Sequence, residues 1–256
     1  RVLPFEWDDE ARTELLTEPS AILRDPLLVT PLDDESYLLL DDVRLYYSLI
    51  DAGVQHLPVQ ICPPVQLSVS AGPIGLVHFG PEELNRVASR FPDRIELIHG
   101  RSRHVDAADT LHLKFRFVDS SEAHVHIRHS SRSGCPMPLD ALFRAVVDAG
   151  SYFLLPENGE EADLLDHVPA FSGTVTLPHF DLEDLRRAVA SERPFPPGLF
   201  QVQAACRVLG VDFPLHVLTD QSGVEDKQSF LAELIGLRAR RRRIACYDGR
   251  VYRLNR

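Results

Sequence analysis

The chain has 256 residues, of which 44% are hydrophobic and 25% charged, a composition typical of a globular protein with a substantial core. Its formal net charge is −11 at pH 7, and residues 1–42 alone contribute −9, from twelve acidic residues and three arginines. This acidic balance argues against broad nucleic-acid binding, which needs a basic surface. No apolar run reaches the length of a membrane span, and the start does not read as a signal peptide. We therefore expect a cytoplasmic protein without a membrane partner.

The most informative segment is residues 24–61, which read as strand, acidic turn, strand, helix and strand. Three apolar runs predict strands, at Leu27–Thr30, Tyr37–Leu40 and Leu57–Ile61. Asp41 and Asp42 open the intervening helix, and Gly53 closes it. An Asp between a strand end and a helix start accepts backbone N–H bonds, and the helix start favours anions. We expect Asp41 to contact a ligand, to cap the helix, or both.

Further along, Ala71-Gly72-Pro73 marks a domain boundary, which gives expected domains of residues 1–72 and 73–256. Apolar periodicity predicts helices at residues 81–91, 138–150, 181–191 and 229–243. Additional strands are expected at Ile95–His99, Gln201–Arg207 and Phe213–Leu218, with a terminal hairpin turning at Asp248-Gly249.

Residues 111–118 and 123–129 predict a β-hairpin in which apolar and basic side chains alternate. If apolar positions pair with apolar positions, the basic groups share one face. The groups proposed to bind an anion there are His112, Lys114, Arg116, His124 and His126. The histidines alone would suit a metal, but the interleaved Lys114 and Arg116 disfavour a cation. A phosphate, carboxylate or propionate group suits the mixture better. The alternative is a solvated strand face.

The segment from Pro26 to Gln60 resembles the ParB/sulfiredoxin-like fold, in which a strand ends in an Asp-Gly-x-His-Arg loop that leads into a helix. It is most similar to the ParB-like free L-serine kinases, and among these to the siderophore-locus type. The positions that carry the match are Pro26, Leu28, Val29, Thr30, Tyr37, Asp41, Val43, Tyr46, Ser48, Leu49, Gly53, Pro58, Val59 and Gln60. The resemblance implies an α+β protein, with a ParB/sulfiredoxin-like N-terminal domain followed by a larger mixed α/β domain.

The same resemblance implies that ADP or ATP, with Mg²⁺, is held by Asp41, Asp42, Val43 and Arg44. A Glu near the N-terminus would act as base on the hydroxyl of L-serine, and the product would be O-phosphoserine. A gapless count from Pro26 places Leu3 at the position of this base, and Glu6 is the nearest carboxylate. The expected catalytic residues are therefore Glu6 and Asp41.

This chain departs from the family pattern in the loop itself, because Asp42, Arg44 and Leu45 stand where the pattern has Gly, His and Arg. A second carboxylate at position 42 repels phosphate unless a divalent metal lies between them. The sequence thus leaves three hypotheses open. The chain is a serine kinase with altered phosphate contacts or without catalysis, a ligand-sensing or DNA-binding regulator on the same fold, or a small-molecule-binding scaffold in a siderophore or amino-acid pathway.

Two remaining features carry weaker interpretations. A run of arginines, Arg238 and Arg240–Arg243, is explained by its place in a last helical turn, with DNA contact as the less favoured alternative. The cysteines are widely spaced and form no Cys-x-x-Cys pair, which argues against a zinc knuckle. We expect reduced, buried thiols at Cys62, Cys135, Cys206 and Cys246, and no resident metal site.

Overall fold

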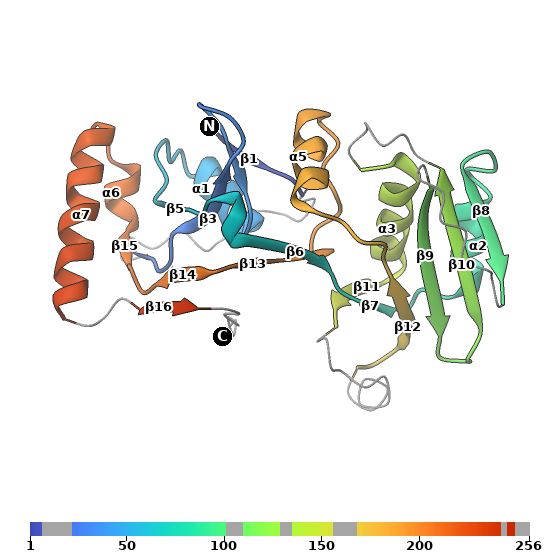
Figure 1. Cartoon of the computed structure of the whole chain (residues 1–256). Coiled ribbons are helices and arrows are strands. Elements are labelled where there is room, and N and C mark those ends of the chain that lie inside the picture. Colours follow the sequence, from blue (N-terminus) through green and yellow to red (C-terminus); the bar gives the residue numbers. More distant parts are fainter. Residues whose placement is uncertain (7–21, 101–109, 129–134, 156–167, 242–244, 249–256) are drawn as a thin grey trace. The chain divides into compact units, whose positions relative to one another are not determined.

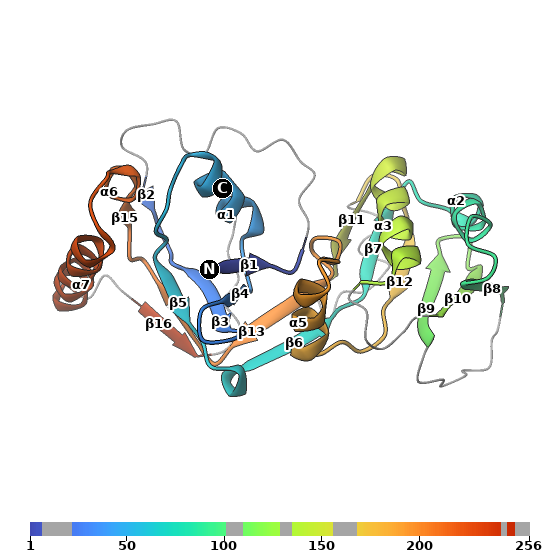
Figure 2. The ribbon, with the colours of Figure 1, turned by 90° about the horizontal axis from the view of Figure 1, so that it is seen from above.

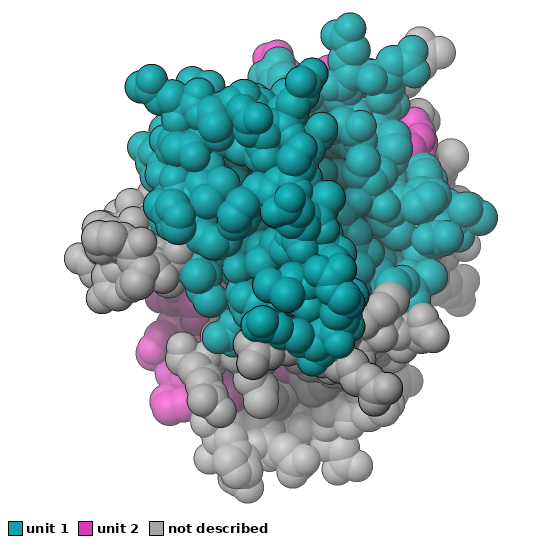
Figure 3. Space-filling view, turned by 90° about the vertical axis from the view of Figure 1, so that its left-hand side faces the viewer, with its two compact units in different colours: residues 1–68, 202–256 teal, residues 69–201 magenta. Residues whose placement is uncertain are grey.

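The computed structural model describes residues 1–6, 22–100, 110–128, 135–155, 168–241 and 245–248 (Figures 1 and 2). The chain divides into two compact units, which Figure 3 colours separately. Unit 1 comprises residues 1–68 and 202–256, and unit 2 comprises residues 69–201. The chain leaves unit 1 within β6 (Leu67–Ala71) and returns within β13 (Phe200–Ala204), and these two strands pair with each other.

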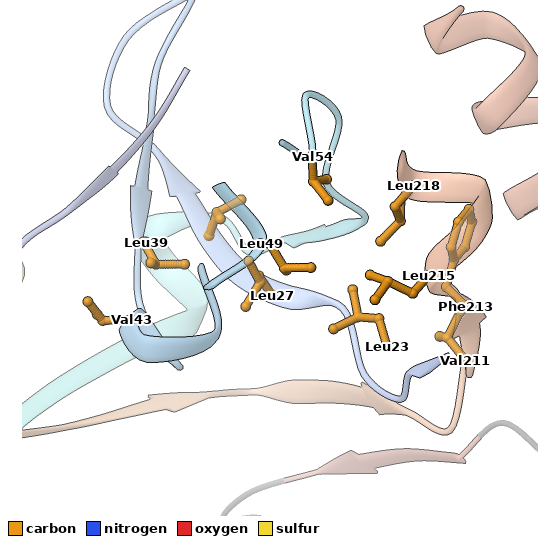
Figure 4. Close-up of a cluster of buried hydrophobic side chains, with 11 residues drawn as sticks. Leu23, Leu27, Leu39, Val43, Leu49, Val54, Val211, Phe213, Leu215 and Leu218 are labelled. Carbon is orange, nitrogen blue, oxygen red and sulfur yellow. The ribbon is translucent and has the colours of Figure 1, made fainter. Parts of the chain in front are cut away.

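This division differs from the expected domains of residues 1–72 and 73–256. The first boundary lies close to the expected one, but residues 202–256 belong to the first unit. The reason is a shared hydrophobic core, in which side chains from both ends of the chain are buried together (Figure 4). Its members are Leu23, Leu27, Val29, Leu39, Val43, Leu49, Val54, Val211, Phe213, Leu215 and Leu218. Such contacts between distant segments leave no local signal in the sequence.

Unit 1 is built around a four-stranded sheet with the order β1-β4-β3-β5. The bounds are β1 (Val2–Pro4), β4 (Tyr37–Leu39), β3 (Leu27–Pro31) and β5 (Val59–Ile61). β1 runs parallel to β4, β4 antiparallel to β3, and β3 parallel to β5. The expected strand–turn–strand–helix–strand order of residues 24–61 is confirmed, because α1 (Val43–Asp51) follows β4 and precedes β5.

Seven further described elements belong to unit 1. They are β2 (Ile22–Leu23), η1 (Pro64–Gln66), β14 (Cys206–Leu209), β15 (Phe213–Pro214), α6 (Leu215–Thr219), α7 (Val224–Arg240) and β16 (Ala245–Asp248). β2 pairs with β15, and β14 pairs with β16. The second strand of the expected terminal hairpin lies outside the described residues.

The strand expected at Phe213–Leu218 is wrong beyond Pro214, where α6 begins. Lys227 from α7 explains how this short helix ends: its buried Nζ donates to the carbonyl oxygens of Leu218 at 2.8 Å and Asp220 at 3.0 Å. These are carbonyls that the end of a helix leaves without an intrahelical partner. α6 and α7 accordingly lie side by side in both ribbon views (Figures 1 and 2).

In its described residues, unit 2 has a six-stranded antiparallel sheet with the order β11-β7-β12-β9-β10-β8 and three helices. The strands are β11 (Ser151–Leu154), β7 (Ile74–Val77), β12 (Phe171–Thr176), β9 (Thr110–Phe117), β10 (Glu122–Arg128) and β8 (Ile95–His99). The helices are α2 (Pro81–Ala88), α3 (Met137–Ala149) and α5 (Leu182–Ala190). Both units mix helices and strands, so the α+β expectation is confirmed.

Candidate functional site

Asp41 lies just after β4, and its carboxylate links β3 to β14 in unit 1. Its Oδ1 accepts a hydrogen bond from the backbone N–H of Leu28 in β3 at 2.7 Å. Its Oδ2 lies 2.5 Å from Nη2 of Arg207 in β14, and the two form a salt bridge. Both carboxylate oxygens are therefore fixed, and the cap of α1 is the next residue, Asp42. Asp41 was expected to contact a ligand or cap the helix, and the groups that hold its carboxylate are Leu28 and Arg207.

Gln60 of β5 fixes the other side of the Arg207 guanidinium. Its Oε1 accepts from Nη1 of Arg207 at 3.2 Å and from the backbone N–H of Val208 at 2.9 Å. Its Nε2 donates to the carbonyl of Cys206 at 2.8 Å. The Arg207 side chain is only 15% exposed. Gln60 and Arg207 thus fasten β14 to the sheet, and they form with Asp41 a connected polar network.

The strand pairing of β1 with β4 bears on the expected catalytic base, Glu6. The parallel register pairs Leu3 with Leu38 and Pro4 with Leu39. Glu6 and Asp41 each follow the last pair by two residues, at the same end of the sheet. Neighbouring strands are about 4.8 Å apart, so this topology brings two carboxylates from distant segments to the same end of the sheet. Glu6 is partly buried there.

The remaining residues predicted to bind nucleotide lie at the start of α1. Asp42 adopts the left-handed conformation, with φ 46° and ψ 51°, at the position where the family loop has Gly. Its Oδ1 accepts from the N–H of Leu45 at 3.3 Å. Val43 is buried in the core of unit 1 (Figure 4), so only its backbone can meet a ligand. Arg44 is exposed.

The basic hairpin of unit 2 has the register that the sequence predicted. His112 pairs with His126, Lys114 with His124 and Arg116 with Glu122, and directly paired residues share a face. Nε2 of His112 lies 2.9 Å from Nδ1 of His124, so one of these nitrogens donates and the other accepts. Nε2 of His126 is buried without a hydrogen-bond partner among the described residues.

The sequence reading overlooked Glu122, which lies on the same face. Its Oε1 is 2.9 Å from Nζ of Lys114 and 3.5 Å from Nε of Arg116. These contacts, with the Lys114 hydrogen bond as the largest cause, lower the pKa of the Glu122 carboxyl below its usual range. The carboxylate reduces the positive charge of the face. Anion binding by His112, Lys114, Arg116, His124 and His126 stays a prediction.

The cysteines divide into two kinds. Cys62 and Cys135 are free, buried thiols, as expected. Burial raises the pKa of both thiols, most strongly that of Cys135. Cys206 is disulfide-bonded, so the expectation of a reduced thiol is wrong at this position.

Among the described residues, no three His, Cys, Asp or Glu side chains are placed to hold a metal ion. Within the same part of the chain, no helix combines the length and apolar character that crossing a membrane requires.

Comparisons with known proteins show that this chain is similar to serine kinases. No protein-family model matches the sequence. The ATP-dependent L-serine kinase SbnI of Staphylococcus aureus is 23% identical over 248 residues, which cover 94% of this chain and 87% of the kinase. A solved structure of C-terminally truncated SbnI superposes with a TM-score of 0.65 and 16% identity, over 92% of this chain and 93% of the other.

A free serine kinase in complex with AMP gives a TM-score of 0.61 at 14% identity, over 85% of this chain and 90% of the other. A mutant of a free serine kinase in complex with ADP gives a TM-score of 0.60 with the same identity and coverage. The chain therefore has the ParB-like fold of these kinases along most of its length, as the sequence predicted.

Proposed function

We propose that this chain is a serine-kinase-like protein. It binds an adenine nucleotide at the end of the unit 1 sheet where Glu6 and Asp41 lie, and it transfers a phosphoryl group to L-serine. The observation that carries the proposal is the placement of Glu6 and Asp41 beyond paired positions of β1 and β4. It supports a joint role for the two residues that the family resemblance assigns to catalysis. The fold shared with SbnI and the nucleotide-bound free serine kinases supports the same function.

In this proposal the two carboxylates have different tasks. Glu6 accepts the proton of the serine hydroxyl while the hydroxyl oxygen forms a bond to the terminal phosphorus of the nucleotide. The bond between that phosphorus and its bridging oxygen breaks, so ATP leaves as ADP and serine becomes O-phosphoserine. Asp41 is held by Leu28 and Arg207 and orients the groups that meet the phosphates.

The proposal includes Mg²⁺, which usually binds through one or two carboxylates together with substrate phosphates. Asp41 and Asp42 are adjacent carboxylates at the start of α1, which fits this pattern of ligands. When bound, Mg²⁺ would supply positive charge between these carboxylates and the nucleotide. The protein residues would then position the serine hydroxyl and remove its proton.

The first test is direct detection of product. The full chain is incubated with ATP or ADP, Mg²⁺ and L-serine, and O-phosphoserine is measured by mass spectrometry. We expect product with the wild type and a loss of at least about 100-fold in rate with Glu6→Gln, given the usual contribution of a general base. Glu35→Gln, at an exposed carboxylate in the turn before β4, is the matched control and should retain the rate.

Two outcomes have different meanings. Nucleotide binding without product would leave a nucleotide-binding protein that has lost catalysis. Absence of both binding and product would contradict the proposal and favour the non-catalytic regulator. For DNA binding, the described part of α7 offers little support, because Arg238 is engaged with Asp212 at 2.8 Å. We also propose a cytoplasmic location, where ATP and L-serine are available.

A further inference from the structure

Arg207 is a cation that local sequence reading did not place at the site. It comes from β14 and reaches Asp41 across 166 positions of the sequence. A guanidinium has five N–H donors in a planar fork, and the bonds to Asp41 and Gln60 use two of them. The side chain is 15% exposed, so its surroundings are mostly protein while part of it still meets solvent.

The orientation of this guanidinium is fixed by groups that are themselves fixed. Asp41 is held by the N–H of Leu28, and Gln60 is held by backbone groups of Cys206 and Val208. Two acceptors at different nitrogens determine the plane of the fork. A fork held in this way is ready to bind a second anion through its remaining donors, because little side-chain entropy is left to lose.

The charges at the site indicate what that second anion is. The loop after Asp41 holds Asp42, Arg44 and Leu45 at positions where the family pattern has Gly, His and Arg. A phosphate that approaches two adjacent carboxylates is repelled unless positive charge lies close by. Arg207 contacts Asp41 directly and compensates its charge. Arg is also the side chain best suited to phosphate oxygens, because its paired N–H groups match their spacing.

We propose that Arg207 is a phosphate-binding residue of this site, adding from β14 to the positive charge that Arg44 brings to the altered loop. This inference rests on the proposed function, since it assumes that a nucleotide binds at the end of the sheet near Asp41. It adds a residue from the C-terminal part of unit 1. It also accounts for how a chain with Asp42 in place of Gly keeps a nucleotide site.

The test is calorimetric titration of the full chain with adenosine, AMP and ADP, each with Mg²⁺. A lost charge-assisted hydrogen bond to phosphate weakens binding by about 10- to 100-fold. We expect this loss for ADP with Arg207→Gln, while adenosine binds within about twofold of wild type, since experimental error is of that order. Arg207→Lys keeps the charge but loses the fork, and its ADP affinity should lie between the two.

Arg238→Gln is the matched control, because Arg238 also forms a salt bridge in unit 1, with Asp212, and its side chain is 22% exposed. It should leave all three affinities unchanged. Circular dichroism and thermal unfolding establish which variants are folded. If Arg207→Gln does not fold, the comparison of Arg207→Lys with wild type decides the question, since both keep the charge and differ in the fork.

The outcomes separate this inference from the proposed function. Equal ADP affinity in folded Arg207→Gln and wild type overturns the role of Arg207 but leaves the nucleotide site. Equal losses for adenosine and ADP also overturn it, because they indicate a purely structural role. If wild type binds none of the three ligands, the proposed function itself fails, and the inference fails with it.

Discussion

Replacement of Asp42 by Gly should strengthen the binding of nucleotide in the absence of Mg²⁺ without harming the fold. Asp42 is a non-glycine residue at φ 46° and ψ 51°, a conformation that Gly adopts without steric cost. Gly gains up to about 1 kcal/mol from relief of this strain, since Asp tolerates the region better than most residues. Loss of the 3.3 Å cap bond to Leu45 costs only a few tenths of that amount, roughly 0.3 kcal/mol. The free energy of unfolding should therefore rise slightly or stay unchanged.

The effect on binding is electrostatic and larger. For a phosphate charge roughly 6 Å from the Asp42 carboxylate, the repulsion is about 0.7 kcal/mol at a dielectric constant of 80 and about 2.8 kcal/mol at 20. Removal of the carboxylate should thus tighten ADP binding by about 3- to 100-fold. Asp42→Asn is the control for charge alone, because Asn also tolerates the left-handed region and can cap a helix.

The assay is calorimetric titration with ADP in the absence of Mg²⁺, at about 0.05 M and about 1 M salt, where the screening length falls from above 10 Å to about 3 Å. Both variants should bind ADP more tightly than wild type at low salt, and the advantage should shrink at high salt. Binding that is unchanged or weaker in both variants would refute the reasoning, because it would mean that Asp42 does not face the phosphates. Tightening in Gly alone would assign the effect to backbone conformation.

Three other predictions follow from the described contacts. Asp41→Asn should lower the free energy of unfolding, measured by urea titration, by about 2–4 kcal/mol, because Arg207 loses its charge partner in a mostly buried site. A change below about 0.5 kcal/mol would contradict a stabilising role of the Asp41–Arg207 salt bridge. When the protein is denatured without reductant and alkylated, peptide mapping should find label at Cys62 and Cys135 but not at Cys206. Label at Cys206 would disprove its disulfide bond. Glu122→Gln should release Lys114 and Arg116 and strengthen binding of inorganic phosphate to unit 2, followed by NMR shifts of the His126 ring. Identical titrations of variant and wild type would argue against an anion site on this face.

Local patterns predicted the elements around Asp41 well, because each had its own physical signal. The apolar runs gave β3 and β4, and Gly53 was recognised as the end of α1, where it has φ 76°. The same is true of the basic hairpin, whose alternation fixed which side chains share a face. Glu122 was missed because the predicted second strand began at residue 123, which assigned Glu122 to the turn, whereas β10 begins at Glu122.

Prediction failed where distant segments determine the structure. The sequence does not reveal that residues 202–256 return to unit 1, because Phe213 and Leu218 look like any apolar residues until they meet Leu23 and Leu27 in one core. The α6 helix was read as a strand, since its end depends on Lys227 from another helix.

The altered loop and the distant arginine are best understood together. A site that keeps Asp41 but places Asp42 beside it gains negative charge, and a further cation close to the phosphates then favours their binding. Arg207 is such a cation, and its contacts also hold β14 against Asp41 and Gln60. The Arg207 side chain would therefore both bind phosphate and stabilise the fold. For this reason Asp42→Gly should raise ADP affinity by a larger factor in Arg207→Lys than in wild type, whereas two independent residues would give the same factor in both backgrounds.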